Sequence, residues 1–226
     1  PPDEPAVRGL SNAQVQYFLA EQVDNVQVEI LDAEGKLVDS FEGTGQVVEE
    51  APQSRGGLPS TMPTTAAGLN RFEWNQRYPG ATEFDGMIIF SARPQEGPKA
   101  PPGRYQVRVT ANGLSEVAEF ELIMDPRLKG VTQADLEEQF QLASKIRDKT
   151  SAANDAVIEI RSVRDRLEDR LESSAIPPLQ TAGRNLIDKL SEIERELYQV
   201  KNQTRQDPLN FPIRLNNRFA SLRRSV

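Results

Sequence analysis

The hydrophobic pattern of this chain changes once, at Asp125 and Pro126, and the change separates two kinds of secondary structure. Before it, apolar and polar residues tend to alternate, which is typical of half-buried β-strands. After it, apolar residues recur three and four positions apart, as in amphipathic helices. We therefore predict an α+β chain, with a β domain in residues 1–126 followed by a helical domain in residues 127–226.

The β domain is predicted to hold about seven short strands, the number typical of an immunoglobulin- or fibronectin-like sandwich. Gly35 and the pair Asn112 and Gly113 provide tight turns between consecutive strands. The predicted strands cover residues 15–19, 26–30, 37–41, 67–75, 86–90, 105–109 and 117–124.

The connections in this domain are predicted from their Pro and Gly content. Residues 43–65 and 78–85 are long loops, which either contribute to recognition or only connect strands. Residues 93–102 contain Pro94, Pro98, Pro101 and Pro102 and are predicted to form a stiff polyproline-like strap. A proline-rich arm precedes the first strand.

Three helices are predicted in the helical domain, over about residues 132–174, 178–202 and 212–224. Thr132 and Asp135 form a capping box, and neither Gly nor Pro interrupts residues 132–175. Pro177 and Pro178 separate the first two helices, and so short a link makes them antiparallel. Apolar residues of the second helix recur with heptad spacing: Leu186, Leu190, Ile193, Leu197 and Val200.

The predicted helices cannot cover each other completely. The apolar stripe of the first helix extends to Leu167 and Leu171, but its antiparallel partner covers one side only and the third helix is short. The helices therefore form either an antiparallel hairpin or an incomplete three-helix bundle. We expect the sandwich, a further segment or another chain to cover the rest, which makes Leu167 and Leu171 candidate partner contacts.

Composition limits the chemistry, because the chain contains no Cys and no His. It has no disulfide, no thiolate or imidazole metal site and no Ser-His-Asp triad. The carboxylates Asp165, Glu168, Asp169 and Glu172 alternate with arginines on one helix and are interpreted as surface ion pairs. Glu192, Glu194 and Glu196 are interpreted as a solvated face. We predict no catalytic, cofactor-binding or metal-binding residue, and therefore no enzyme.

Charge indicates which partners to expect. The net charge is −7, with 9 Lys and Arg against 19 Asp and Glu in residues 1–126 and 18 against 15 in residues 127–226. An acidic chain does not favour nucleic acid, and no apolar run is long enough to span a membrane. We predict other protein subunits as partners, with a glycan as a further possibility. Candidate contacts are Tyr78 for a sugar and the basic cluster Arg214, Arg218, Arg223 and Arg224 for an acidic surface.

Seven segments resemble, in the same order, the C-terminal region of large exported bacterial sortilin-like β-propeller proteins, often labelled glycosyl hydrolases. These are residues 16–19 (QYFL), 28–36 (VEILDAEGK), 68–74 (GLNRFEW), 77–81 (RYPGA), 101–109 (PPGRYQVRV), 125–127 (DPR) and 210–218 (NFPIRLNNR). In that family an immunoglobulin-like domain and a helical region follow the propeller, and no catalytic residue is assigned to them.

The resemblance implies a periplasmic or secreted protein. The first residues, Pro1 to Pro5, contain no methionine and no signal peptide, so we expect a processed N-terminus or a piece of a longer protein. Together with the composition, the resemblance leads us to expect a non-enzymatic interaction or scaffold module that docks on a larger extracytoplasmic assembly. The alternative is an accessory carbohydrate-binding module of a secreted glycosidase-like protein.

Overall fold

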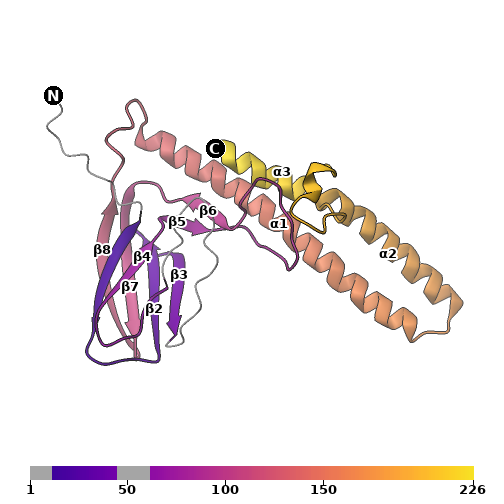
Figure 1. Ribbon diagram of the computed structural model, residues 1–226, viewed down its shortest axis with the longest axis horizontal. Coiled ribbons are helices and arrows are strands. Elements are labelled where there is room, and N and C mark those ends of the chain that lie inside the picture. Colours follow the sequence, from indigo (N-terminus) through magenta and orange to yellow (C-terminus); the bar gives the residue numbers. More distant parts are fainter. Residues whose placement is uncertain (1–11, 45–61) are drawn as a thin grey trace. The chain divides into compact units, whose positions relative to one another are not determined.

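A computed structural model describes residues 12–44 and 62–226 and confirms the α+β class (Figure 1). Antiparallel sheets precede three C-terminal α-helices. The contacts divide the chain into two compact units. The first consists of the residues up to Tyr78 together with Lys99–Leu136, and the second of Pro79–Pro98 together with Glu137–Val226. The helical unit therefore includes a segment from the half of the chain that was predicted to be only β.

Six strands build the two main sheets of the first unit. Strand β1 (Ala13–Leu19) pairs antiparallel with β4 (Gly68–Trp74). The larger sheet has the order β3-β2-β7-β8, and its antiparallel strands are β2 (Asn25–Asp32), β3 (Leu37–Thr44), β7 (Gly103–Ala111) and β8 (Leu114–Leu122). Two short strands, β5 (Arg77–Pro79) and β6 (Glu96–Lys99), pair with each other.

One hydrophobic core lies between the two main sheets. Phe72 and Trp74 of β4 are completely buried, as are Val26, Val28 and Ile30 of β2, and all five belong to the same cluster. Burying a side chain of this size contributes roughly 1.5 to 3 kcal/mol, so these residues are a main source of the attraction between the sheets.

Both predicted turns are present. The Asp32 carboxylate accepts hydrogen bonds from the backbone N–H groups of Glu34 (3.1 Å) and Lys36 (2.8 Å), and Gly35 has a φ of 78°. Asn112 and Gly113, which join β7 to β8, also have positive φ angles, as a two-residue hairpin turn requires. These turns fix the register of the two hairpins of the larger sheet.

The helices are α1 (Gln133–Glu172), α2 (Pro177–Leu197) and α3 (Leu215–Leu222), with short 3₁₀ turns at Asp207–Leu209 and Arg223–Ser225. The capping box is confirmed, since the Thr132 N–H donates to the Asp135 carboxylate (2.8 Å) and the Asp135 N–H donates to the Thr132 hydroxyl (3.2 Å). Helix α2 ends earlier than predicted because Tyr198 adopts an extended backbone conformation. No helix in the part of the chain that the structure describes is long and apolar enough to cross a membrane.

One predicted strand and one predicted connection prove different. Residues 86–90 are not a strand, and the backbone N–H groups of Ile88 and Phe90 donate to Tyr198 and Asn217 instead. Residues 93–102 are not a continuous polyproline strap, because they contain β6. The N-terminal arm and most of the predicted loop 43–65 lie outside the described residues.

Candidate interaction surface

Within the second unit, the segment Pro79–Pro98 packs on the helices. The Asn154 amide of α1 donates to the Thr82 carbonyl (2.6 Å), and the Thr82 N–H donates to the Ser151 hydroxyl (3.1 Å). The Arg147 guanidinium donates to the Pro79 carbonyl (2.9 Å). We expected another part of the chain to cover the apolar stripe of α1. The segment inserted between β5 and β6 lies against α1 and is one such part.

The same segment is fastened to α3 and to the residues that follow it. The Asn217 carboxamide accepts from the Phe90 N–H (2.7 Å) and donates to the Phe90 carbonyl (3.0 Å). Beneath this contact, the buried Asn216 side chain donates to Asn154 (2.9 Å). Buried amides with matched partners fix one relative position of α1, α3 and the inserted segment.

The four candidate arginines do not form one free basic patch. Arg223 donates to the Arg93 carbonyl (2.9 Å), and Arg224 donates to the Ser91 hydroxyl (2.7 Å), so both hold the inserted segment. Arg214 lies 3.5 Å from the Glu196 carboxylate, and Arg218 is exposed.

A charged cluster locks α1 to α2. Glu194 is buried, which corrects its interpretation as part of a solvated face, and its carboxylate accepts from Arg161 (2.8 Å) and Arg164 (2.7 Å). The Arg161 guanidinium lies over the ring of Phe84, 4.7 Å from its centroid, and Phe84 meets Tyr198 edge to face. The cluster borders a hollow of about 460 Å³.

The buried side of α2 differs from the predicted one. Gly183 faces Leu171 of α1 so closely that an added Cβ would lie 2.7 Å from a Leu171 methyl carbon. The residues turned toward α1 recur at spacings of three and four and are at least half-buried: Gly183, Ile187, Leu190, Glu194 and Leu197. Of the five residues in the predicted heptad pattern, only Leu190 and Leu197 lie on this side.

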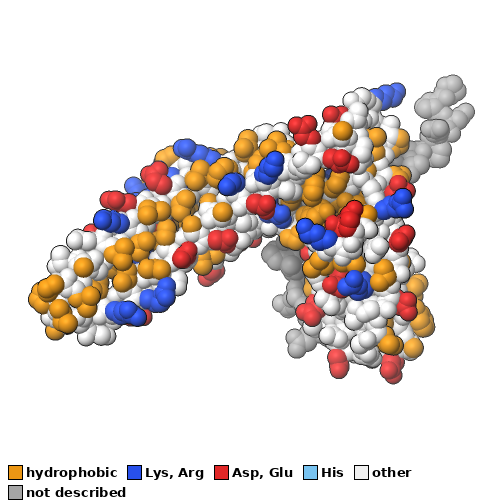
Figure 2. Space-filling model, turned by 180° about the vertical axis from the view of Figure 1, so that it is seen from behind, with side chains coloured by type: hydrophobic (Ala, Val, Ile, Leu, Met, Phe, Trp, Pro, Cys, Tyr) orange, Lys and Arg blue, Asp and Glu red, His pale blue; other side chains and the backbone are white. Residues whose placement is uncertain are grey.

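Three large apolar residues of α2 lie beside its buried face and are only partly exposed. Leu179, Leu186 and Ile193 are seven residues apart and are exposed by 48%, 44% and 52%; we call these three the outer stripe. Figure 2 shows apolar side chains gathered along the helices between charged side chains of both signs. Three apolar residues at this spacing on one face are typical of a helix that packs against another helix.

The other residues predicted to contact a partner are half-buried among residues of their own units. Leu167 and Leu171 are half-buried, and Leu171 contacts α2 at Gly183. Tyr78 of β5 is half-buried and packs against the core cluster of the first unit. Burial raises the pKa of its phenol, as expected when an aromatic ring is part of a core.

In residues 12–44 and 62–226, no group of three acidic side chains comes together where it could hold a metal ion. Comparison with known protein families finds no match to this chain, and comparison with curated proteins finds none either. The outer stripe of α2 is the candidate interaction surface of the helical unit, because its three apolar side chains are exposed at a regular spacing.

Proposed function

We propose that this chain is a non-enzymatic interaction or scaffold module of a larger extracytoplasmic assembly, and that it binds a helix of another protein through the outer stripe. The observation that supports this proposal most directly is the exposed, seven-residue spacing of Leu179, Leu186 and Ile193. A regular apolar row favours a helical partner, because the knobs of one helix enter holes at the same spacing on the other.

The dimensions and charges of the stripe fit a modest interface. Its first and last residues are fourteen steps apart along the helix, which corresponds to about 21 Å at 1.5 Å per residue. Lys189, Glu192 and Glu196 flank it and would orient a partner helix by charge. The Glu194 cluster and the inserted segment hold α2 in place, so little order has to be gained on binding.

The immunoglobulin-like nature of the first unit belongs to the same proposal. The sheet order β3-β2-β7-β8 corresponds to strands C′-C-F-G of an immunoglobulin-type sheet. Tyr105, near the start of β7, donates to the Pro101 carbonyl four residues upstream (2.9 Å), as in a tyrosine corner. Both features agree with the resemblance to the C-terminal region of exported sortilin-like propeller proteins.

Nothing comparable favours the carbohydrate-binding alternative. Its aromatic candidate, Tyr78, is half-buried against the core, which leaves less of the ring for stacking on a sugar. That alternative stays a prediction.

The proposal is tested by site-specific photo-cross-linking in the cells that produce the protein. A cross-linking amino acid at position 186 or 193 is expected to capture the same protein from both sites. The control is position 142, because Leu142 of α1 is equally exposed (47%) but lies outside the stripe. Capture of the same protein from all three positions, or from none, would contradict the proposal.

The double variant Leu186→Glu/Ile193→Glu supplies the quantitative test. It is expected to weaken binding of the cross-linked partner at least about tenfold, because two apolar anchors become charged. Leu142→Glu is expected to leave binding unchanged. Far-UV circular dichroism should show that both variants keep the wild-type helix content, since all three side chains are already exposed.

A further inference from the structure

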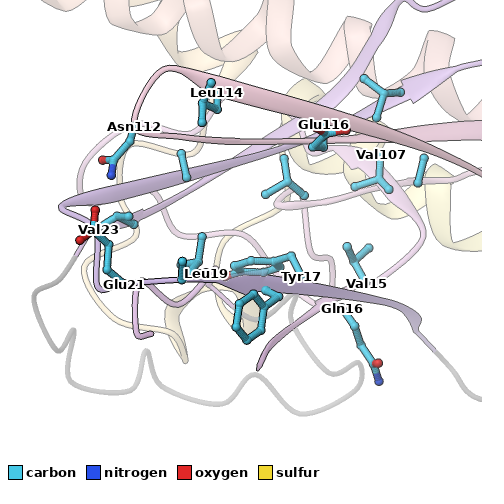
Figure 3. A pocket seen from close by; sticks show the side chains of 16 residues that line it. Val15, Gln16, Tyr17, Leu19, Glu21, Val23, Val107, Asn112, Leu114 and Glu116 are labelled. Atoms are coloured by element: carbon cyan, nitrogen blue, oxygen red, sulfur yellow. The ribbon is translucent and has the colours of Figure 1, made fainter. Parts of the chain in front are cut away.

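The first unit has an open apolar groove between its two sheets, with a volume of about 650 Å³ (Figure 3). Val15, Tyr17 and Leu19 of β1 line one side, and Leu114 and Glu116 of β8 line the other. Gln16 points away from the groove, as the alternation along a strand requires.

The groove exists because the smaller sheet does not cover the larger one. Val107 and Val109 of β7 pair with Ala118 and Glu116 of β8, so these β8 residues face the same side as the core. Leu114 is on that side too, yet it is 79% exposed. Adjacent strands lie about 4.8 Å apart. One additional strand beside β1 would therefore lie over β8 and cover this face.

Strand β1 has a free edge next to the groove. Among the described residues it pairs only with β4, and the groove is lined by β1 and not by β4. The backbone N–H and C=O groups on that edge are available to pair with an extended chain. Added strands of this kind obtain affinity from backbone hydrogen bonds and specificity from alternate side chains.

The charge of the groove selects the side chains of such a strand. Glu21 and Glu116 are among the sixteen residues that line it, and no Lys or Arg is among them. The Glu116 side chain is exposed on the inner side of β8 and has no side-chain hydrogen bond or ion pair with any described residue. A Lys or Arg on the added strand, facing Glu116, would pair with this carboxylate.

We propose that the free edge of β1 binds an extended segment of another protein as an added strand. Alternate side chains of this segment are apolar and enter the groove, and one Lys or Arg among them faces Glu116. This site is distinct from the outer stripe of α2 and takes a different class of partner, so either proposal can fail without the other.

The first experiment exchanges charges. The probe is the capped peptide Thr-Val-Thr-Lys-Thr-Val-Thr, as long as β1, and its counterpart has Glu in place of Lys. Binding to the full chain is measured by NMR titration. The Lys peptide is expected to bind Glu116→Lys at least about fivefold more weakly than wild type, and the Glu peptide to show the reverse order.

Glu119→Lys is the matched control, because Glu119 pairs with Gln106 on the opposite face of β8 and the change in net charge is the same. It is expected to bind the Lys peptide as wild type does, within about twofold for a change in long-range charge alone. Equal weakening by both substitutions, or no binding of either peptide to wild type, would overturn the proposal.

The second experiment tests strand pairing itself. Two N-methylated forms of the Lys peptide are compared. One is methylated at its Val and Lys residues, whose side chains enter the groove, and the other is methylated at its Thr residues, whose side chains point away from the groove. Successive N–H groups of a strand point to opposite edges, so only one form loses the donors that face β1. One form is expected to lose binding and the other to keep it. Equal behaviour of both forms would contradict an added strand.

Two other occupants are also distinguished. If the Lys peptide binds only after residues 1–11 are deleted, those residues occupy the site and the proposal is wrong. If wild-type protein sediments as a dimer that Glu116→Lys dissociates, and the peptide does not compete, a second copy occupies the groove and the proposal is equally wrong. Binding to the intact monomer supports it.

Discussion

The phenol of Tyr105 is buried in the core of the first unit and donates to the Pro101 carbonyl oxygen at 2.9 Å. Burial, followed by the neighbouring phenol of Tyr78, raises the pKa of Tyr105 far above its ordinary value of 10.0. The folded protein therefore holds this phenol in its neutral form. Since Trp74 lies 5.8 Å from Tyr105 and is the chain's single tryptophan, its fluorescence reports on this region.

This environment predicts that the contribution of the Tyr105 hydroxyl to the free energy of unfolding depends on pH, and the substitution Tyr105→Phe tests it. Tyr105→Phe is expected to lower the free energy of unfolding at pH 8 by about 1 to 2 kcal/mol, because the Pro101 carbonyl loses its buried donor. A raised folded-state pKa stabilises the protein below the unfolded pKa, and this stabilisation disappears as the pH rises beyond it. The difference between wild type and Tyr105→Phe should therefore shrink above about pH 10.

Urea unfolding followed by Trp74 fluorescence, at several values between pH 8 and pH 11, measures this effect. Tyr17→Phe is a useful comparison, because Tyr17 also donates to a backbone carbonyl, that of Thr64. A constant difference between wild type and Tyr105→Phe across the whole range would contradict the assignment.

At the scale of elements, the sequence predicts the first residues of α1 and α2 better than the buried face of α2. The capping box at Thr132 and the prolines at positions 177 and 178 are local signals, and the first two helices begin within a residue of the predicted positions. The buried face of α2 was predicted only in part, because it includes Gly183 and Glu194, which hydropathy does not identify as core. Residues 86–90 were predicted to be a strand, but their backbone donates to the side chains of Asn217 and Tyr198. These partners are more than 100 residues away in sequence, so no local pattern indicates them.

The Glu194 cluster provides the test at this scale. Glu194→Gln preserves the shape of the side chain but leaves Arg161 and Arg164 without their shared counter-charge. Both arginine side chains are about one-third exposed. We therefore expect Glu194→Gln to lower the free energy of unfolding by about 2 kcal/mol, which is less than the 3 to 5 kcal/mol typical of breaking a fully buried pair. Thermal unfolding followed by far-UV circular dichroism measures it.

Glu192→Gln is the control, because Glu192 is exposed on the same helix and its removal changes the net charge equally. It should change the free energy of unfolding by no more than about 0.5 kcal/mol. If the two variants unfold at the same temperature, the buried cluster does not hold α1 to α2.

At the scale of the whole molecule, a division of the chain by its hydrophobic pattern differs from the division by contacts. The pattern changes at Asp125, but the segment Pro79–Pro98 belongs to the helical unit. No local signal marks it, because its backbone is satisfied by side chains far along the chain: Ser151, Asn154, Tyr198 and Asn217. Asn154 and Asn217 are buried and polar, a combination that a hydropathy pattern treats as surface.

A fragment cut at the sequence boundary tests this division. Residues 127–226 alone lack the inserted segment, so Asn154 and Asn217 lose hydrogen bonds that contribute about 0.5 to 1.5 kcal/mol each. We expect the fragment to melt at a lower temperature than the helices of the full chain, as followed by far-UV circular dichroism. Addition of a synthetic peptide of residues 79–98 should raise the melting temperature with increasing peptide concentration.

The specificity of that rescue follows from the Thr82 and Phe90 contacts. Asn217→Ala in the fragment removes both hydrogen bonds to the Phe90 backbone. It should weaken the binding of the peptide to the fragment at least about tenfold. Arg218→Ala, one residue away on the exposed side of α3, should leave it unchanged. If the fragment has the same melting temperature as the full chain, and the peptide does not change it, the helices need no cover from the β half. Another part of the chain or another protein would then have to cover the apolar stripe predicted from the sequence.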